Sequence, residues 1–407
     1  MSERTGPLSD VRILDLTQAL AGPYGTALLA DLGADVVKIE PPTGDLSRPM
    51  APLPKDFAAP GSSRTAGCDY SGYFASINRN KRSIVLDLKK AEDRDRFLQL
   101  VDTADAVVEN SRAGVMDRLG VGYETLRRKN RRLVYAAIRG FGDPRTGQSP
   151  YADWPAFDIV AQCMGGLVGI TGPIDGRGFP SGASVGDIFP GALAALGVVS
   201  AIHAARRTGE GQFLDVCMVD AILSLCETAV INYTFTGTVL GPRGSGHPAL
   251  CPFDVYETKD GAVAIAAPTD NHWAALCAII ERDDLVRDDR TRDNKRRSAN
   301  RPFVTEIVQA WTRARTKHEI ASALGGKVPV GPVNTASDIF ADPHVKAREM
   351  LVEIDMPGAN PKATLVGTPI KFASTPGGIY RRPPLLGEHT DEILSELAAR
   401  RPRKEES

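Results

Sequence analysis

Short apolar runs alternate with helical stretches over the first third of this chain, and no other feature of the sequence restricts its fold as strongly. The apolar runs span residues 11–16, 34–40, 83–88, 106–110 and 132–138, and helical patterns fall at 24–32, 89–103 and 115–129. Strands that alternate with helices pair in parallel, because each crossover helix returns the chain to the same end of the sheet. The sequence therefore predicts an α/β fold with a doubly wound, mostly parallel, Rossmann-like sheet.

The turn after the first run disfavours one class of ligand. Residues 17–23 lack the Gly-x-Gly-x-x-Gly spacing that cradles a pyrophosphate in nicotinamide and flavin enzymes. Between the second and third apolar runs, residues 41–76 are rich in Pro, Gly and Ser. This composition predicts a long excursion of the chain over the surface, in the form of a loop.

The chain has 407 residues, which exceeds the usual size of one hydrophobic core. After residue 217 the pattern of alternating apolar runs and helices gives way to a helix, a Gly-rich turn and short strands. We expect a large α/β domain over 1–215 and a linker helix over 216–235. A smaller α+β domain is expected over 236–330, with short strands near 253–256 and 262–266. Residues 331–407 are then a linker and a C-terminal return to the large domain, with a final helix over 390–400.

Composition argues against several partners. The chain has 49 basic and 50 acidic residues, and this balance disfavours nucleic acid and membrane surfaces. The uncharged run 188–205 contains Pro190 and is marginal in length for a membrane span, so we predict a buried helix there. The six cysteines form no Cys-x-x-Cys pair and the six histidines are dispersed, which predicts a cytoplasmic protein without a metal site.

One carboxylate stands at the start of that uncharged run. Gly186 precedes Asp187, and a glycine leaves room for a reactant to approach the carboxylate oxygens. A nucleophile would suit this position. The alternative is that Asp187 only caps the helix that follows, since Asp is favoured at a cap.

Several short motifs run through nearly the whole chain in a fixed order. They are Leu14–Thr17, Ala21–Pro23, Leu32–Glu40, Asn80–Ser83, Glu109–Asn110, Met116–Gly120, Asp158–Gln162, Gly186–Asp187, Arg207–Gln212, Val330–Val333 and Leu386–Asp391. Together they resemble the class III CoA-transferases, a family that includes formyl-CoA:oxalate and carnitine CoA-transferases and also 2-methylacyl-CoA racemases.

The resemblance implies that Asp187 is the nucleophile, which forms an aspartyl anhydride and then an aspartyl-CoA thioester. It also implies CoA contacts at Ala19, Leu20, Ala21, Asn78, Arg79, Asn80, Lys81, Asn110 and Arg118. Lys81 and Arg118 suit the CoA phosphates, although Lys81 and Arg82 also read as an ordinary solvated pair before a strand. Leu20, Pro41 and Pro155 depart from the formyl-CoA pattern, so the phosphate contacts are partly rebuilt.

Two further positions bear on the reaction. Gly244, Ser245 and Gly246 fall where the family has a glycine loop over the site, although they also read as a simple turn. The racemases have a His at the position of Phe157, and phenylalanine cannot move a proton. The sequence thus favours transfer over the alternatives, a racemase or an inactive CoA-binding scaffold. Asp158 either orients groups near the anhydride or makes structural hydrogen bonds.

The partners implied by the resemblance are an acyl-CoA donor, with succinyl-CoA as one choice, and a free carboxylic acid acceptor. CoA is then a substrate, and no permanently bound cofactor is expected. Arg139 and Arg243 are candidates for meeting a second carboxylate of the acid. The resemblance also implies a homodimer in which two ring-shaped chains interlock.

Overall fold

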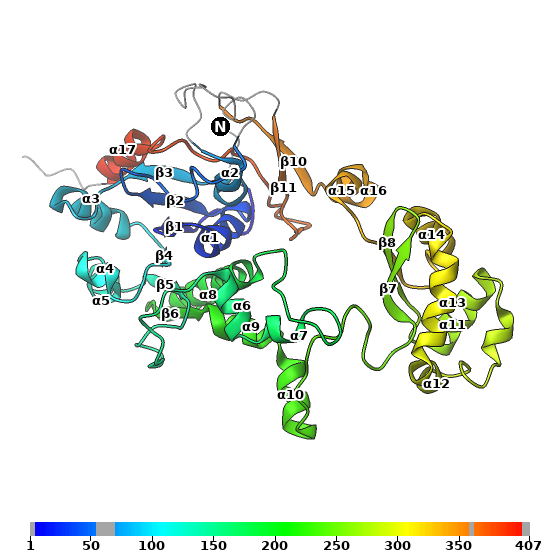
Figure 1. The fold of residues 1–407 in the computed structure, drawn as a ribbon. Helices are drawn as coiled ribbons and strands as arrows, with labels where there is room; N and C mark the ends of the chain where they lie inside the picture. Colours follow the sequence, from blue (N-terminus) through cyan, green and yellow to red (C-terminus); the bar gives the residue numbers. More distant parts are fainter. Residues whose placement is uncertain (1–4, 54–69, 358–361, 401–407) are drawn as a thin grey trace, which may run out of the picture. The chain divides into compact units, whose positions relative to one another are not determined.

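The computed structural model describes residues 5–53, 70–357 and 362–400 (Figure 1). Chain contacts divide it into two compact units, which are described separately below. Unit 1 comprises Met1–Val168, Pro180–Thr238 and Lys346–Ser407, and unit 2 comprises Gly169–Phe179 and Val239–Val345. The sequence placed the small domain at 236–330, and nothing in the sequence indicated that residues 169–179 join unit 2.

Within the described residues, unit 1 holds one parallel sheet of six strands in the order β3-β2-β1-β4-β5-β6. The strands are β1 (Arg12–Asp15), β2 (Asp35–Glu40), β3 (Arg82–Val85), β4 (Ala106–Glu109), β5 (Val134–Arg139) and β6 (Phe213–Cys217). The predicted parallel sheet is confirmed. β6 was not predicted, because this half-buried edge strand lacks the continuous apolar run of the central strands.

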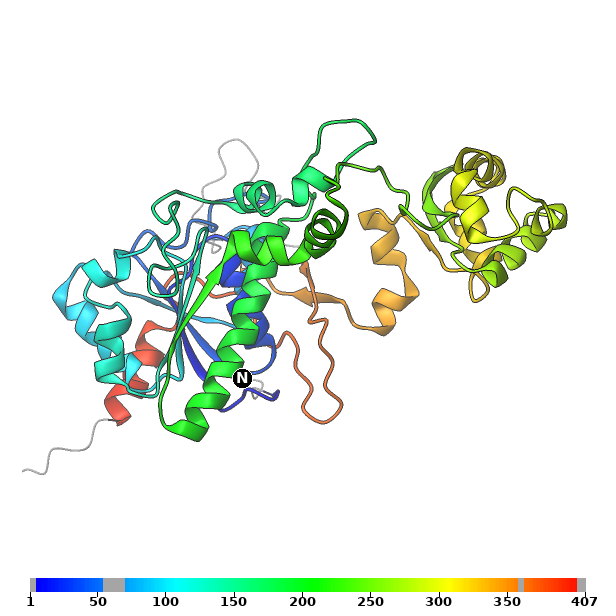
Figure 2. The same cartoon turned by 90° about the horizontal axis from the view of Figure 1, so that it is seen from below.

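Helices cover both faces of this sheet (Figures 1 and 2). One face packs against α1 (Ala21–Asp31), α6 (Asp158–Met164), α8 (Val185–Thr208) and α9 (Met218–Leu225). The other packs against α3 (Ala91–Val101), α4 (Val115–Arg118), α5 (Tyr123–Lys129) and α17 (Thr390–Arg400). Each buried face of the sheet therefore has its own apolar core, as a doubly wound fold requires.

Two glycines allow α1 and α8 to pack closely. A Cβ atom on Gly25 would lie 2.4 Å from the carbonyl oxygen of Gly191, and one on Gly191 would lie 2.3 Å from that of Ala21. By length and apolar composition α8 is a candidate membrane span, and so is α9 together with the helix that follows it. In unit 1, however, α8 packs along the sheet and contributes Ala194, Val198 and Ile202 to the core, which is the buried helix that the sequence predicts.

The rest of unit 1 lies around this sheet. Part of the predicted excursion 41–76 lies outside the described residues, but its end forms α2 (Gly72–Asn78), which begins with Ser71 as its N-cap. After α9 comes α10 (Glu227–Thr236), and the C-terminal segment adds the antiparallel pair β10 (Leu351–Ile354) and β11 (Ala363–Val366).

Unit 2 has a small core around the buried Trp273. Its antiparallel sheet consists of β7 (Phe253–Thr258), β8 (Gly261–Ala266) and β9 (Val330–Pro332). Its helices are α11 (Asp270–Ile279), the short 3₁₀ helix η2 (Asp283–Val286), α12 (Asn294–Ala299), α13 (Arg301–Arg313), α14 (Lys317–Leu324) and α15 (Ala336–Ala341). The helices α7 (Leu167–Ile170) and α16 (Pro343–Ala347) span the boundaries between the units.

Candidate active site

A cavity of about 440 Å³ opens in unit 1 at the carboxyl ends of β1, β4 and β5. β1 and β4 are neighbours in the sheet, yet the chain leaves them in opposite directions, toward β2 and toward β5. Such a switch point leaves a crevice between the two loops, and ligands of doubly wound folds bind there. The cavity is lined by residues 18–21 after β1 and by residues 110–113 after β4.

Asp187 lies at this cavity, in the first turn of α8. The helix begins at Val185, three residues before the predicted start, and its N-cap residue is Ser184. Asp187 is therefore not the cap. The positive end of the helix dipole still favours its ionised form.

The role that the sequence suggested for Gly186 needs a correction. A Cβ atom at this position would lie 2.4 Å from the carbonyl oxygen of Asp158, so the glycine allows α6 to approach α8 and does not leave space for a reactant. The Asp158 carboxylate then accepts a hydrogen bond from the Gly186 N–H (2.7 Å). The side-chain amide of Gln162 donates to both Asp158 oxygens, at 3.0 and 2.9 Å. Asp158 thus holds the turn that carries Asp187.

The surroundings of Asp187 make it a weaker acid. Burial, and then the nearby charge of Asp158, raise the pKa of Asp187 to about 7. A carboxylate with such a pKa is partly ionised at neutral pH and poorly hydrated, which suits a nucleophile that must attack a carbonyl carbon.

Four of the predicted CoA contacts line the cavity with Asp187: Ala19, Leu20, Ala21 and Asn110. Phe157, which is 70% exposed, and Trp154 form part of its wall. Arg139 also lines it, but its guanidinium is committed to Glu109, Asp143 and the carbonyl oxygen of Ser111. Arg139 therefore has little capacity left for a second substrate carboxylate.

Comparison with known proteins identifies the chain. The family model for CoA-transferase family III matches residues 8–390. The chain belongs to this family. A succinyl-CoA:mesaconate CoA-transferase of Haloarcula marismortui is 48% identical to this chain, and the alignment covers 96% of each protein. A succinate–glutarate CoA-transferase of Agrobacterium fabrum is 36% identical, and that alignment covers 98% of this chain and 97% of the relative. A CAIB/BAIF family protein from Brucella suis has a TM-score of 0.84 at 33% identity and covers 97% of this chain and 100% of its own. This protein is thus an enzyme of the class III CoA-transferases.

The predicted CoA contacts at residues 78–81 do not line the cavity, and their side chains make contacts within the fold. The Lys81 ammonium is fully buried and contacts Asp15, Asn78 and the carbonyl oxygen of Pro23, at 2.9 to 3.0 Å. These contacts occupy all three of its donors. In the described chain Lys81 therefore has no donor left for a phosphate, and its burial does not fit the alternative of a solvated pair.

The neighbours of Lys81 in the motif are also committed to structure. Arg79 pairs with Asp31 at 2.7 Å. The Asn80 side chain bonds Asp31 and accepts from the N–H groups of Tyr380 and Arg381, so it anchors the C-terminal segment of unit 1.

Two cations near the loop after β4 differ in their relation to the cavity. Arg118 is exposed on α4 and does not line the cavity, whereas Arg112 is exposed and lines it. No hydrogen bond or ion pair engages the Arg112 side chain within the part of the chain that the structure describes. Arg112 was missed in the sequence, although it stands two residues after Asn110 and a free guanidinium suits a phosphate.

Gly244, Ser245 and Gly246 lie in unit 2, where they line a second cavity of about 560 Å³ together with Arg243 and His247. Gly244 has a φ of 69°, a left-handed conformation that favours glycine. Its N–H donates to the carbonyl oxygen of Gly172 at 2.8 Å.

Among residues 5–53, 70–357 and 362–400, no group of three or more His, Cys, Asp or Glu side chains lies close enough together to hold a metal ion.

Proposed function

We propose that this enzyme moves CoA from an acyl-CoA thioester, with succinyl-CoA as donor, to a free dicarboxylic acid. The observation that carries the proposal is Asp187, a carboxylate of raised pKa at the cavity of the switch point. The relatives named above support succinyl-CoA as donor and a small dicarboxylate, such as mesaconate or glutarate, as acceptor.

Asp187 acts as the nucleophile in this proposal. Its carboxylate oxygen attacks the thioester carbonyl carbon, the C–S bond breaks, and an anhydride and CoA thiolate form. The thiolate then attacks the aspartyl carbonyl carbon of the anhydride and releases the donor acid as a carboxylate. The acceptor carboxylate attacks the resulting aspartyl-CoA thioester, and the same two steps in reverse transfer CoA to it. Every intermediate hydrolyses if water reaches it, so the partly buried position of Asp187 protects the exchange.

The test is a comparison of wild type with Asp187→Ala. Wild type is incubated with succinyl-CoA and each of a panel of free acids, and new acyl-CoA products are measured by mass spectrometry. We expect the variant to lose transfer by several orders of magnitude while it still binds CoA, because only the covalent route is removed. Hydroxylamine added with the donor should inactivate wild type by modifying Asp187.

Asp289→Ala is the matched control, since the Asp289 side chain is 87% exposed in unit 2. Near-normal transfer by Asp187→Ala would exclude the mechanism. Incubation of a 2-methylacyl-CoA in deuterated solvent separates transfer from racemisation. Transfer predicts no exchange of the α-proton, and exchange that is lost in the Asp187 or Asp158 variants would favour a racemase.

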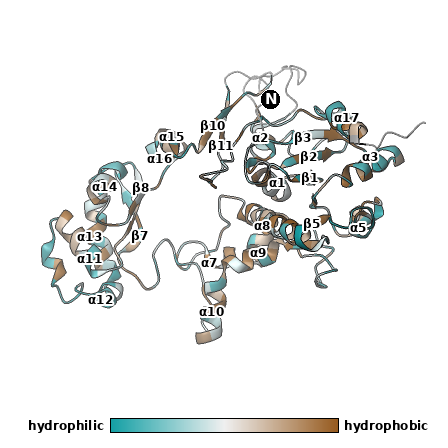
Figure 3. Cartoon of the chain, turned by 180° about the vertical axis from the view of Figure 1, so that it is seen from behind, coloured by the Kyte–Doolittle hydropathy of each residue, from teal (hydrophilic) through white to brown (hydrophobic). Residues whose placement is uncertain are grey.

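We also propose that the enzyme is a homodimer of interlocked chains. The described residues support an extensive interface, because no residue of α10 is buried within the single chain. Four large apolar side chains of α10 are 49 to 80% exposed: Val230, Ile231, Tyr233 and Phe235. The hydropathy of this helix can be followed in Figure 3. Exposed apolar surface of this kind marks a protein interface. The chain also leaves unit 1 and re-enters it, as interlocking requires.

A further inference from the structure

The backbone of Gln18, in the loop after β1, is held on one side by a side chain from the neighbouring loop. The Gln18 N–H donates to Oδ1 of Asn110 at 2.8 Å, and Nδ2 of Asn110 donates back to the Gln18 carbonyl oxygen at 2.8 Å. One amide side chain thus satisfies both polar groups of one residue, as a neighbouring strand would.

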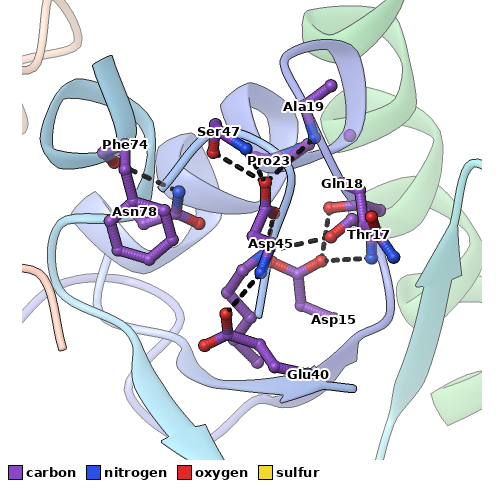
Figure 4. Close-up of polar contacts among 12 residues, drawn as sticks. Asp15, Thr17, Gln18, Ala19, Pro23, Glu40, Asp45, Ser47, Phe74 and Asn78 are labelled. Atoms are coloured by element: carbon purple, nitrogen blue, oxygen red, sulfur yellow. Dashed lines mark hydrogen bonds and ion pairs between the residues drawn. The ribbon is translucent and has the colours of Figure 1, made fainter. Parts of the chain in front are cut away.

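A buried ion pair holds the two peptide groups that flank Gln18. Lys38 donates to the carbonyl oxygen of Thr17 at 2.9 Å. Asp45 accepts from the N–H of Ala19 at 3.3 Å, as Figure 4 shows. Lys38 and Asp45 pair with each other at 2.7 Å, and both side chains are fully buried. Four backbone groups in succession, from Thr17 to Ala19, therefore have fixed partners.

This arrangement is costly for the fold. Two buried charges lose their hydration, and replacing such a pair with apolar side chains is often neutral or stabilising. Ala19 also has a φ of 64°, a left-handed conformation that a side chain disfavours. Strain and buried charge beside a cavity are typical of a site in which one group must be held in a fixed place.

The side chain of Gln18 is the group that these contacts leave free. It lines the cavity together with Asp187, and no hydrogen bond engages its amide within the described part of the chain. Of the other polar side chains of the cavity, Asn110 and Arg139 are committed to partners, whereas the free Arg112 guanidinium suits a CoA phosphate. Gln18 therefore offers an uncommitted N–H donor from a rigid backbone.

We propose that Gln18 contacts the substrate, and that its amide N–H donates to the thioester carbonyl oxygen as Asp187 attacks. Lys38, Asp45 and Asn110 are its positioning residues. The inference rests on the proposed function, because it assigns a donor to the oxygen that becomes negative in that reaction. A fixed donor at such an oxygen strengthens as charge develops and needs no reorganisation.

Gln18→Leu tests the contact, since leucine keeps similar bulk and removes the amide. Removal of one such donor lowers kcat by about 100-fold in other enzymes, so we expect a loss of that order, with a change in the KM for succinyl-CoA below about threefold. The control is Gln148→Leu, because Gln148 is exposed and does not line the cavity. An unchanged kcat, or a raised KM alone, would overturn the assignment.

A double-mutant comparison tests the positioning residues. The joint replacement Lys38→Met with Asp45→Leu removes both charges of the pair, so that neither member stays buried without the other. We expect this replacement to lower kcat in wild type but to cause no further loss in the Gln18→Leu background, because its effect passes through Gln18. Losses that multiply would overturn the positioning role.

These outcomes are separable from the proposed function. If Asp187→Ala is inactive and Gln18→Leu is fully active, only the inference about Gln18 fails. If Asp187→Ala retains activity, the proposed function fails as well.

Discussion

Replacement of Asp187 with Asn should stabilise the protein, although it removes the proposed nucleophile. Asn keeps the shape of the side chain but cannot ionise. In the wild type, burial and the charge of Asp158 raise the pKa of Asp187 from 3.8 to about 7. The folded state therefore holds a proton that the unfolded chain releases at a lower pH.

The sign and size of the effect follow from these two pKa values. Between the unfolded and folded values the folded state binds more protons, so the stability of the wild type falls as pH rises from about 4 to about 7 and is then flat. The advantage of Asp187→Asn should grow from about 0.5 kcal/mol at pH 4 to about 4 kcal/mol at pH 8, as an upper value.

Urea denaturation followed by circular dichroism at pH 5 and pH 8 measures this advantage. Both proteins are compared at one protomer concentration, because the unfolding of a dimer depends on concentration. We expect the advantage to increase by about 2.5 kcal/mol between the two pH values. Asp289→Asn is the control for an exposed carboxylate. An advantage that is equal at both pH values would refute the reasoning.

Three further outcomes are expected. Asp158→Asn keeps an acceptor for the Gly186 N–H but removes a charge that raises the pKa of Asp187. The acid limb of the kcat/KM profile should therefore move to lower pH. If the limb does not move, burial alone raises the pKa of Asp187. Gly186→Ala forces a Cβ atom against the Asp158 carbonyl and should cost about 1 to 3 kcal/mol in urea denaturation; an unchanged midpoint would contradict the packing. Analytical ultracentrifugation should show a dimer at nanomolar concentration, whereas a folded, active monomer would exclude the interlocked dimer.

The central strands were predictable because burial on both faces produces continuous apolar runs. All six residues of β2 are buried, and the predicted run 34–40 differs from it by one residue. The edge strand β6 and the seven-residue helix α6 give no such signal. The local pattern drew attention to Asp187, since its glycine and the helix that follows are adjacent in sequence, but its role as nucleophile came from the family resemblance.

Contacts between distant residues were not predictable in the same way. The Lys81 ammonium pairs with Asp15, 66 positions away, and this pairing decides that it is structural. The contacts around Gln18 come from residues up to 92 positions away. A single sequence shows that these residues are polar, but it does not show which partner each one meets in the fold.

The last helix has a consequence for how the enzyme is made. Arg82 on β3 pairs with Glu392 and Glu396 of α17, and Arg12 on β1 pairs with Glu396 as well. Arg82 and Glu392 are 310 positions apart, a stretch that takes about 15 to 60 s to synthesise at typical rates. During that time the apolar surface that Ile393 and Leu397 later cover stays open on the ribosome-bound chain. The core of unit 1 is therefore completed only once α17 has been made, and a chain without α17 would leave this apolar surface uncovered and prone to aggregation.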